Sequence, residues 1–100
     1  CHKFGKEGAS VVVCGFATDP VEDVVQNLKA KGYPAIGHGG DISIEQYAKE
    51  CVEMTVATFG KLDILINNAG VFLATAEIDK YPVDDFDLSL RMNLRTAFLM

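Results

Sequence analysis

The segment with the clearest chemical potential is the Asn-Asn-Ala-Gly turn at 67–70, which follows an apolar run at 62–66. Asparagine amides bond both backbone and ligands, while Ala and Gly let a flat ligand approach the chain closely. Asn and Gly are also ordinary turn formers, so a plain connector is the competing interpretation. The turn is a candidate ligand site.

Two further polar residues could meet a ligand. Asp41 stands just before Ser43 at the start of a helical pattern, so its carboxylate either binds a ligand or serves only the helix N-terminus. Asn93 lies seven residues after Phe86 on an apolar helical stripe, and a buried amide without a partner costs about 1–3 kcal/mol. Asn93 is therefore either a core amide bonded to neighbouring backbone or a functional amide, and the two roles are compatible.

The remaining reactive side chains form no recognisable catalytic set. None of the three tyrosines is followed by Lys four residues later, and no nucleophile has a base beside it. The two histidines lack partners at ligand spacing, so we expect no metal site. Three widely spaced cysteines favour free structural thiols in a reducing, cytoplasmic compartment.

Apolar spacing predicts alternating strands and helices. Strands are predicted at 10–14, 35–38 and 62–66. Helices are predicted at 19–32, 43–60 and 82–100, with an irregular stretch at 71–81. Asp19 and Ser43 are each followed three residues later by Glu or Gln, which predicts a capping box at both helix starts. Gly32 and Gly60 are predicted to end these helices. This alternation indicates a parallel α/β sheet, in which ligands bind beyond the carboxyl ends of the strands.

Composition excludes several classes of function. The chain of 100 residues has room for at most one small domain, and its net charge of −5 with scattered basic residues argues against nucleic-acid or anionic-membrane partners. The apolar runs are too short to cross a membrane. The chain opens without Met and stops inside an apolar helical pattern, so we expect it to be an internal piece of a longer protein.

Together these motifs resemble the classical short-chain dehydrogenases/reductases, in particular 3-oxoacyl-reductase-like members. Three segments carry the likeness in family order: Gly39–Ser43, Leu62–Gly70, and the helix with Phe86-Asp87, Met92-Asn93-Leu94 and Phe98. The resemblance covers nearly the whole chain. It implies that residues 1–100 form a partial NAD(P)-binding Rossmann-like domain, a doubly wound parallel sheet with strands 2–4 and their helices but without the first strand and the C-terminal half.

The resemblance also implies roles for single residues. Asp41 would bond the adenine amino group and Ile42 would pack beside the ring. The ribose and nicotinamide side would be lined by Asn67, Ala69 and Gly70. Asn93 would be the family's active-site asparagine, which holds a helix carbonyl open to bind water.

Cofactor choice in such folds is set at the end of the first strand seen here, at Gly15 and Phe16. An acid there commonly bonds the ribose 2′-hydroxyl of NAD, and its absence favours NADP(H), with NAD(H) as the other possibility. Asp19 could reach the ribose, but its place before Pro20 favours a helix cap.

The resemblance implies that the parent protein is an oxidoreductase, transferring hydride between NADP(H) or NAD(H) and a small carbonyl or secondary alcohol. The family's Gly-rich turn, catalytic Ser and Tyr-x-x-x-Lys pair would lie outside this chain. We therefore expect the chain alone to be inactive and poorly folded. The competing interpretations are a dehydratase or epimerase on the same fold, a non-catalytic nucleotide-binding member acting in regulation or assembly, and, last, a flavodoxin-like signalling domain. Relatives commonly form homodimers or homotetramers through the last helix, and the resemblance implies the same for the parent protein.

Overall fold

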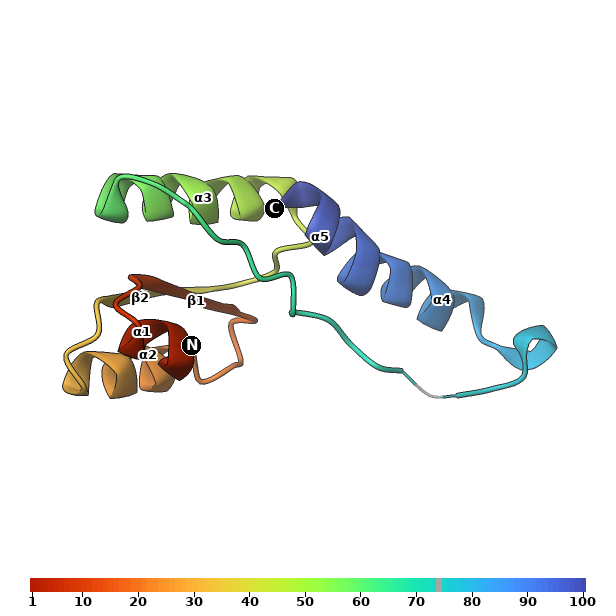
Figure 1. The fold of residues 1–100 in the computed structure, drawn as a ribbon. Coiled ribbons are helices and arrows are strands. Elements are labelled where there is room, and N and C mark those ends of the chain that lie inside the picture. The colour runs from red at the N-terminus through yellow and green to blue at the C-terminus, as the bar shows by residue number, and fades with distance from the viewer. Residues whose placement is uncertain (74) are drawn as a thin grey trace.

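The computed structural model describes residues 1–73 and 75–100, and it has a layered α/β arrangement (Figure 1). In chain order the elements are α1 (His2–Lys6), β1 (Val11–Gly15), α2 (Val21–Ala30), β2 (Ala35–Gly39), α3 (Glu45–Phe59), the 3₁₀ turn η1 (Ile78–Lys80), α4 (Val83–Ser89), the π-helical η2 (Leu90–Arg95) and α5 (Thr96–Leu99). Helix α2 covers one face of the strands and α3 covers the other (Figure 1). This order and layering confirm the predicted α/β class.

Strands β1 and β2 pair in parallel, and their register runs from Val11 opposite Ala35 to Gly15 opposite Gly39. The pairing brings the two carboxyl ends to one edge, where the Gly40 N–H donates to the Gly15 carbonyl at 2.8 Å. The two predicted strands are thus confirmed: β1 begins and ends one residue later than predicted, and β2 extends one residue further at its carboxyl end.

The hydrophobic core lies between this sheet and α2. Alternate residues of β1 point toward α2, because side chains of a strand alternate between its faces. On α2 the apolar residues recur at steps of four and three, which places them on one helix face. The cluster consists of Val11, Val13, Val21, Val25, Leu28 and Ala35. Val25 and Leu28 are 1% and 0% exposed, so α2 is firmly docked.

Both predicted capping boxes are wrong. Within the described residues no side chain caps α2 or α3, whose N-cap positions are Pro20 and Ile44. The carboxylate of Asp19 instead accepts the Phe16 N–H at 2.7 Å, and that of Asp41 accepts the Ser43 N–H at 2.9 Å. Short acidic side chains bond nearby turn backbone readily, and here that local bond takes precedence over the cap. The predicted helix ends are confirmed by positive φ angles of 79° and 80° at Gly32 and Gly60.

The predicted strand at 62–66 is wrong. Among the described residues only β1 and β2 form a sheet, and the whole segment 61–70 is exposed. Its apolar side chains remain in solvent, with Ile64 58% and Ile66 61% exposed. A strand is held by hydrogen bonds to a neighbouring strand, and neither β1 nor β2 pairs with this segment. The segment is apolar, as predicted, but among the described residues it pairs with no strand.

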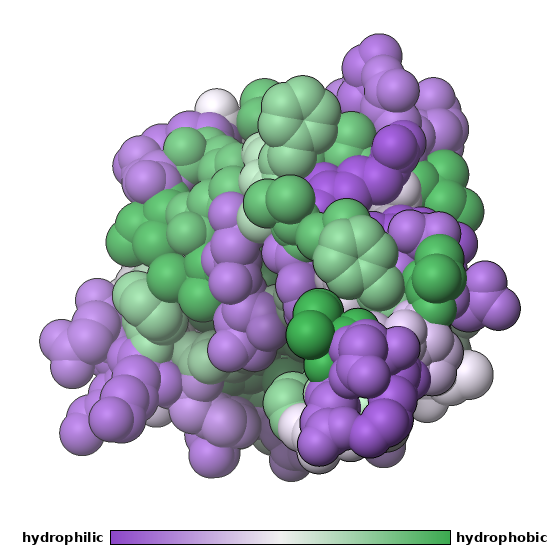
Figure 2. Space-filling view, turned by 90° about the vertical axis from the view of Figure 1, so that its right-hand side faces the viewer, coloured by the Kyte–Doolittle hydropathy of each residue, from purple (hydrophilic) through white to green (hydrophobic). Residues whose placement is uncertain are grey.

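The C-terminal third extends away from the layered body. The radius of gyration is 15.6 Å, against about 13 Å for a compact domain of this length. The predicted irregular stretch at 71–81 contains only η1 among its described residues, and residue 74 lies outside them. The predicted last helix is confirmed, although it changes to π-helical geometry at 90–95. Seen from the α4 end, apolar side chains cover broad areas of the surface (Figure 2), and Phe72 and Val83 are 89% and 71% exposed.

Candidate functional site

The first part of the candidate site is the edge where β1 and β2 end. Gly15 and Phe16 lie beside Gly39 and Gly40 at this edge, joined by the bond from Gly40 to Gly15. A Cβ at Gly15 would lie 2.8 Å from Oδ2 of Asp19, so only glycine leaves room for that carboxylate. A carboxylate therefore stands at the end of β1, although neither Gly15 nor Phe16 is acidic. Sequence reasoning considered Asp19 for this place but preferred a helix cap.

The Asp41 turn follows β2. Asp41 and Ile42 are both half-buried and precede the buried Ser43. Hydrogen bonding by Ser43, whose N–H donates to Asp41 Oδ1, lowers the pKa of Asp41 most. The positive charge of Arg91 lowers it further, while partial burial opposes both. Asp41 is therefore a carboxylate at neutral pH, able to accept a hydrogen bond from a ligand amino group on its remaining lone pairs.

The turn is supported from below by a tyrosine of α3 that sequence reasoning did not select. A Cβ at Gly40 would lie 2.2 Å from the ring of Tyr47, so the glycine lets the ring pack directly against the backbone. The same ring stacks on His38 of β2 with centroids 4.1 Å apart. Tyr47 thus packs both against β2 and against the residue that precedes Asp41, and so helps to position the Asp41 turn at the end of the sheet.

An arginine of the last helix reaches the same turn. Arg95 donates from Nε to the Ser43 carbonyl at 3.1 Å, across 52 residues of sequence. Arg91 lies one turn before Arg95 and contributes to the low pKa of Asp41. The only signal in the sequence is this four-residue spacing of two arginines, which places them on one helix face but names no partner.

Asn93 joins the last helix to the chain that follows the Asn-Asn-Ala-Gly turn. Its Oδ1 accepts the Val71 N–H and its Nδ2 donates to the Val71 carbonyl, both at 3.0 Å. Nδ2 also donates to Ser89 Oγ at 3.2 Å. A Cβ at Gly70 would lie 2.3 Å from Oδ1 of Asn93, so glycine is required for this approach. Asn93 is exposed, which corrects the predicted core position, but its predicted bonding to neighbouring backbone is confirmed.

Hydrogen bonds therefore link the segments that carry the predicted site residues into one connected series. The ends of β1 and β2 are bonded together, the Asp41 turn is bonded to the last helix through Arg95, and that helix is bonded through Asn93 to the residue after Gly70. The turn residues Asn67, Ala69 and Gly70 are themselves exposed. Their contact with a cofactor stays a prediction, as do the roles of Gly15, Phe16, Asp41 and Ile42.

Two hollows lie next to this series. A hollow of about 250 Å³ has Asn93, Ser89 and Tyr81 in its wall, together with Val71. A larger one, about 880 Å³, lies between the start of α3 and the last helix and contains none of the predicted cofactor residues. The smaller hollow is the more relevant one, because it includes the predicted active-site amide. Within residues 1–73 and 75–100 no three His, Cys, Asp or Glu side chains gather as a metal site would require, and no helix is long and apolar enough to cross a membrane.

Comparison with known proteins agrees with this architecture. The short chain dehydrogenase family matches residues 1–100. A peroxisomal 2,4-dienoyl-CoA reductase of Arabidopsis thaliana is 46% identical over 76 residues, covering 75% of this chain and 26% of the relative. A 3-ketoacyl-ACP reductase from Sinorhizobium meliloti superposes with a TM-score of 0.91 at 32% identity, covering 98% of this chain and 38% of that one. The L-sorbose reductase of Gluconobacter frateurii, solved with NADPH and L-sorbose, superposes with a TM-score of 0.86 at 26% identity, covering 97% of this chain and 37% of that one.

The chain belongs to the short-chain dehydrogenase/reductase family, an oxidoreductase family that includes NAD(P)-dependent reductases, and its fold is a partial Rossmann fold. It spans between about a quarter and two fifths of the length of these relatives.

Proposed function

We propose that the protein carrying this chain transfers hydride between a nicotinamide dinucleotide and a small carbonyl or secondary alcohol. In this proposal the chain supplies the adenine side of the cofactor site, part of the nicotinamide side and the active-site amide of Asn93. The observation that carries the proposal is the connected series of contacts from Gly15 through Asp41 to Asn93, at the carboxyl edge of a parallel sheet. Dinucleotides bind at that edge in open α/β folds. The match to the family over residues 1–100 supports the same conclusion.

Each part of the series has a chemical task in this proposal. The Asp41 carboxylate accepts from the adenine amino group, and Ile42 offers an apolar surface to the ring. Gly70 and its neighbours leave space for the ribose and nicotinamide. When bound, the dinucleotide supplies the hydride chemistry. These residues bind and orient it, and none of them acts as a nucleophile.

Asn93 has a positioning task. It sits inside π-helical η2, where backbone bonds run from residue i to i+5 and the regular α-helical ladder is interrupted. Such an interruption leaves a carbonyl able to bind water. Asn93 secures the interrupted segment by its two bonds to the backbone of Val71. This supports the role that the family resemblance implies for Asn93.

Three observations bear on the choice of cofactor. The absence of an acid at Gly15 and Phe16 supports NADP(H), as does the NADPH found with the related sorbose reductase. Against this, Asp19 already places a carboxylate on the Phe16 N–H, where a 2′-phosphate would meet negative charge. We propose that Asp19 sets the preference by lowering the affinity for NADPH.

Titration of the complete protein with NADPH and NADH, followed by nicotinamide fluorescence, tests the proposal. Binding of either dinucleotide, weakened by Asp41→Ala, is the expected result. Glu53→Ala, on the exposed side of α3, is the matched control. Failure to bind either dinucleotide would overturn the proposal.

A second assay separates the enzyme from a non-catalytic nucleotide-binding protein of the same family. The complete protein is supplied with reduced cofactor and a panel of small ketones and aldehydes, and loss of the reduced-nicotinamide absorbance is recorded. Turnover supports hydride transfer. Tight binding without turnover of any carbonyl or alcohol would favour a regulatory or assembly role.

A further inference from the structure

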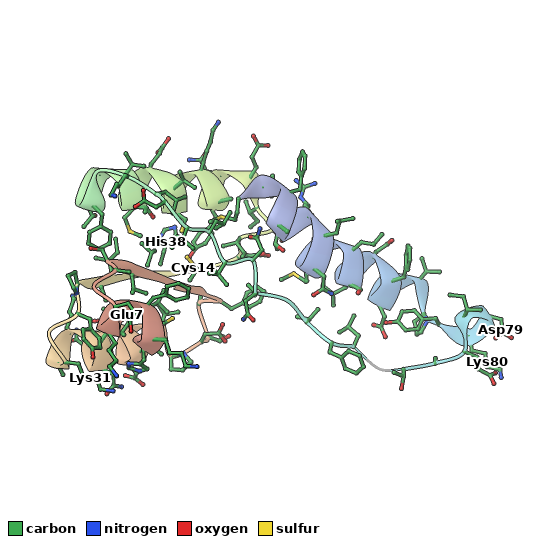
Figure 3. All side chains as sticks on the ribbon, in the orientation of Figure 1. Glu7, Cys14, Lys31, His38, Asp79 and Lys80 are labelled. Carbon is green, nitrogen blue, oxygen red and sulfur yellow. The ribbon has the colours of Figure 1, made fainter. Side chains whose placement is uncertain are left out.

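Two cysteine thiols meet between the sheet and α3. Cys14 of β1 and Cys51 of α3 have their sulfur atoms 3.1 Å apart. Cys51 is 2% exposed and Cys14 is half-buried. Cys14 lies between the strands and α3, next to His38 (Figure 3). The third cysteine, Cys1, is exposed and lies outside this contact.

The meeting of the thiols follows from the periods of the two elements. Val11 and Val13 face α2, so Cys14, one step further along β1, faces α3. On α3 the buried residues are Ala48, Cys51 and Thr55, at steps of three and four, which form the stripe that packs on the sheet. The two sulfurs therefore meet where this stripe faces β1.

Two aromatic side chains lie next to the pair. His38 pairs with Cys14 in the strand register and stacks on Tyr47. Burial raises the pKa of Tyr47 most, and the two nearby cysteines raise it further, so its phenol stays protonated beside them. The hydrogen bond between the sulfurs raises the pKa of Cys14 and lowers that of Cys51, while burial raises the pKa of both. The thiolate is the nucleophilic form of a cysteine, and either sulfur of the pair can donate the shared hydrogen bond to the other.

We propose that Cys14 and Cys51 are a redox-active dithiol that a hydroperoxide closes to an intramolecular disulfide. One sulfur, as thiolate, attacks the peroxide: a sulfur–oxygen bond forms, the oxygen–oxygen bond breaks, and the released hydroxide takes a proton to become water. The second sulfur, losing its proton, attacks the sulfenic sulfur. A sulfur–sulfur bond forms, the sulfur–oxygen bond breaks, and a second water leaves with that proton. With hydrogen peroxide, two thiols and one peroxide give one disulfide and two waters.

The geometry requires little movement for this step. A disulfide joins sulfurs at about 2.05 Å, so the pair must approach by about 1 Å. Hydrogen peroxide is close to water in size, and in this proposal it approaches from the side of Cys14, which is the less buried residue of the pair. The inference rests on this geometry alone and does not depend on the proposed cofactor role.

Peptide mapping tests the proposal. The folded complete protein is treated with hydrogen peroxide, its remaining thiols are alkylated, and it is digested with trypsin. We expect a linked pair of peptides, 7–29 and 50–61, which is lost on reduction. The link should be absent in Cys14→Ser and in Cys51→Ser, and retained in Cys1→Ser as the matched control.

A comparison of folded and unfolded chains keeps the test valid if a serine variant fails to fold. In denaturant the cysteines pair according to loop length, so Cys1 should compete for Cys14 across the shorter loop. In the folded protein the link between Cys14 and Cys51 should dominate over any link to Cys1. Thiols that stay free under peroxide, separate sulfinic acids at the two positions, or a dominant link to Cys1 in the folded protein would each overturn the proposal.

Discussion

Replacing Asp19 by Asn should raise the affinity for NADPH and leave that for NADH nearly unchanged. The Asp19 carboxylate lies 2.7 Å from the Phe16 nitrogen, at the end of the strand where a 2′-phosphate would approach. The amide of Asn has the same shape and can still accept the Phe16 N–H. The substitution therefore removes the negative charge while keeping the local hydrogen bond.

The size of the effect follows from the exposure of Asp19. Two unit charges about 4 Å apart interact by about 1 kcal/mol in water and about 4 kcal/mol near a protein surface of lower effective dielectric constant. Asp19 is exposed, so a value near the lower limit applies, about 1–2 kcal/mol. This corresponds to a roughly 5- to 30-fold gain in NADPH affinity.

Fluorescence titrations of the wild-type protein and Asp19→Asn at low and high salt provide the assay. The gain should shrink at high salt, because screening weakens interactions between exposed charges. Asp23→Asn, which removes the same charge from the first turn of α2, should change NADPH binding far less. The reasoning is refuted if NADPH affinity does not change, or if it changes equally in Asp19→Asn and Asp23→Asn.

Three further predictions concern the contacts of the site. Gly40→Ala should destabilise the protein by about 1–3 kcal/mol in a urea melt, because its methyl group would overlap the Tyr47 ring, and Tyr47→Ala should recover part of the loss in the double variant. Gly70→Ala should weaken dinucleotide binding, because its methyl group would clash with Asn93. In a protein that already carries Asn93→Ala the same substitution should weaken binding less, and an equal loss would contradict this cause. The pKa of Asp41 is lower in the folded protein than in the unfolded chain, where it is about 3.9. The ionised carboxylate therefore stabilises the fold fully above about pH 3.9, and this stabilisation is lost as the pH falls through the pKa of the folded protein. The difference in unfolding free energy between wild type and Asp41→Asn should therefore vanish on acidification from pH 5, and a constant difference would count against it.

Local patterns predicted most of the fold. The Val-rich run of β1 and the apolar spacing of α2 and α3 are read from neighbouring residues, and the glycines at 32 and 60 end helices by their own conformational freedom. Local reasoning failed where two local bonds competed. Asp19 is suited to capping α2, but its carboxylate instead accepts the Phe16 N–H. The sequence does not indicate which of these two hydrogen bonds forms.

Distant partners could not be predicted. Strand formation at 62–66 depends on a neighbouring strand, which apolar character does not supply. The bond from Arg95 to Ser43 joins residues far apart in sequence, so only the folded chain brings them together. The candidate site was found mainly through the family resemblance, while the supporting residues Tyr47 and Arg95 emerged from the structure alone.

The two bonds between Asn93 and Val71 resemble the pair of hydrogen bonds that one residue of a β-strand makes, with a side-chain amide in place of the neighbouring strand. To form both bonds, the side chain at position 93 needs one donor and one acceptor at the same distance from its backbone. Aspartate has two acceptors at that reach, leucine has neither, and glutamine carries the amide one carbon too far. Of these four side chains only asparagine makes both bonds. Because both bonds go to the backbone of residue 71, they do not depend on the side chain that residue carries.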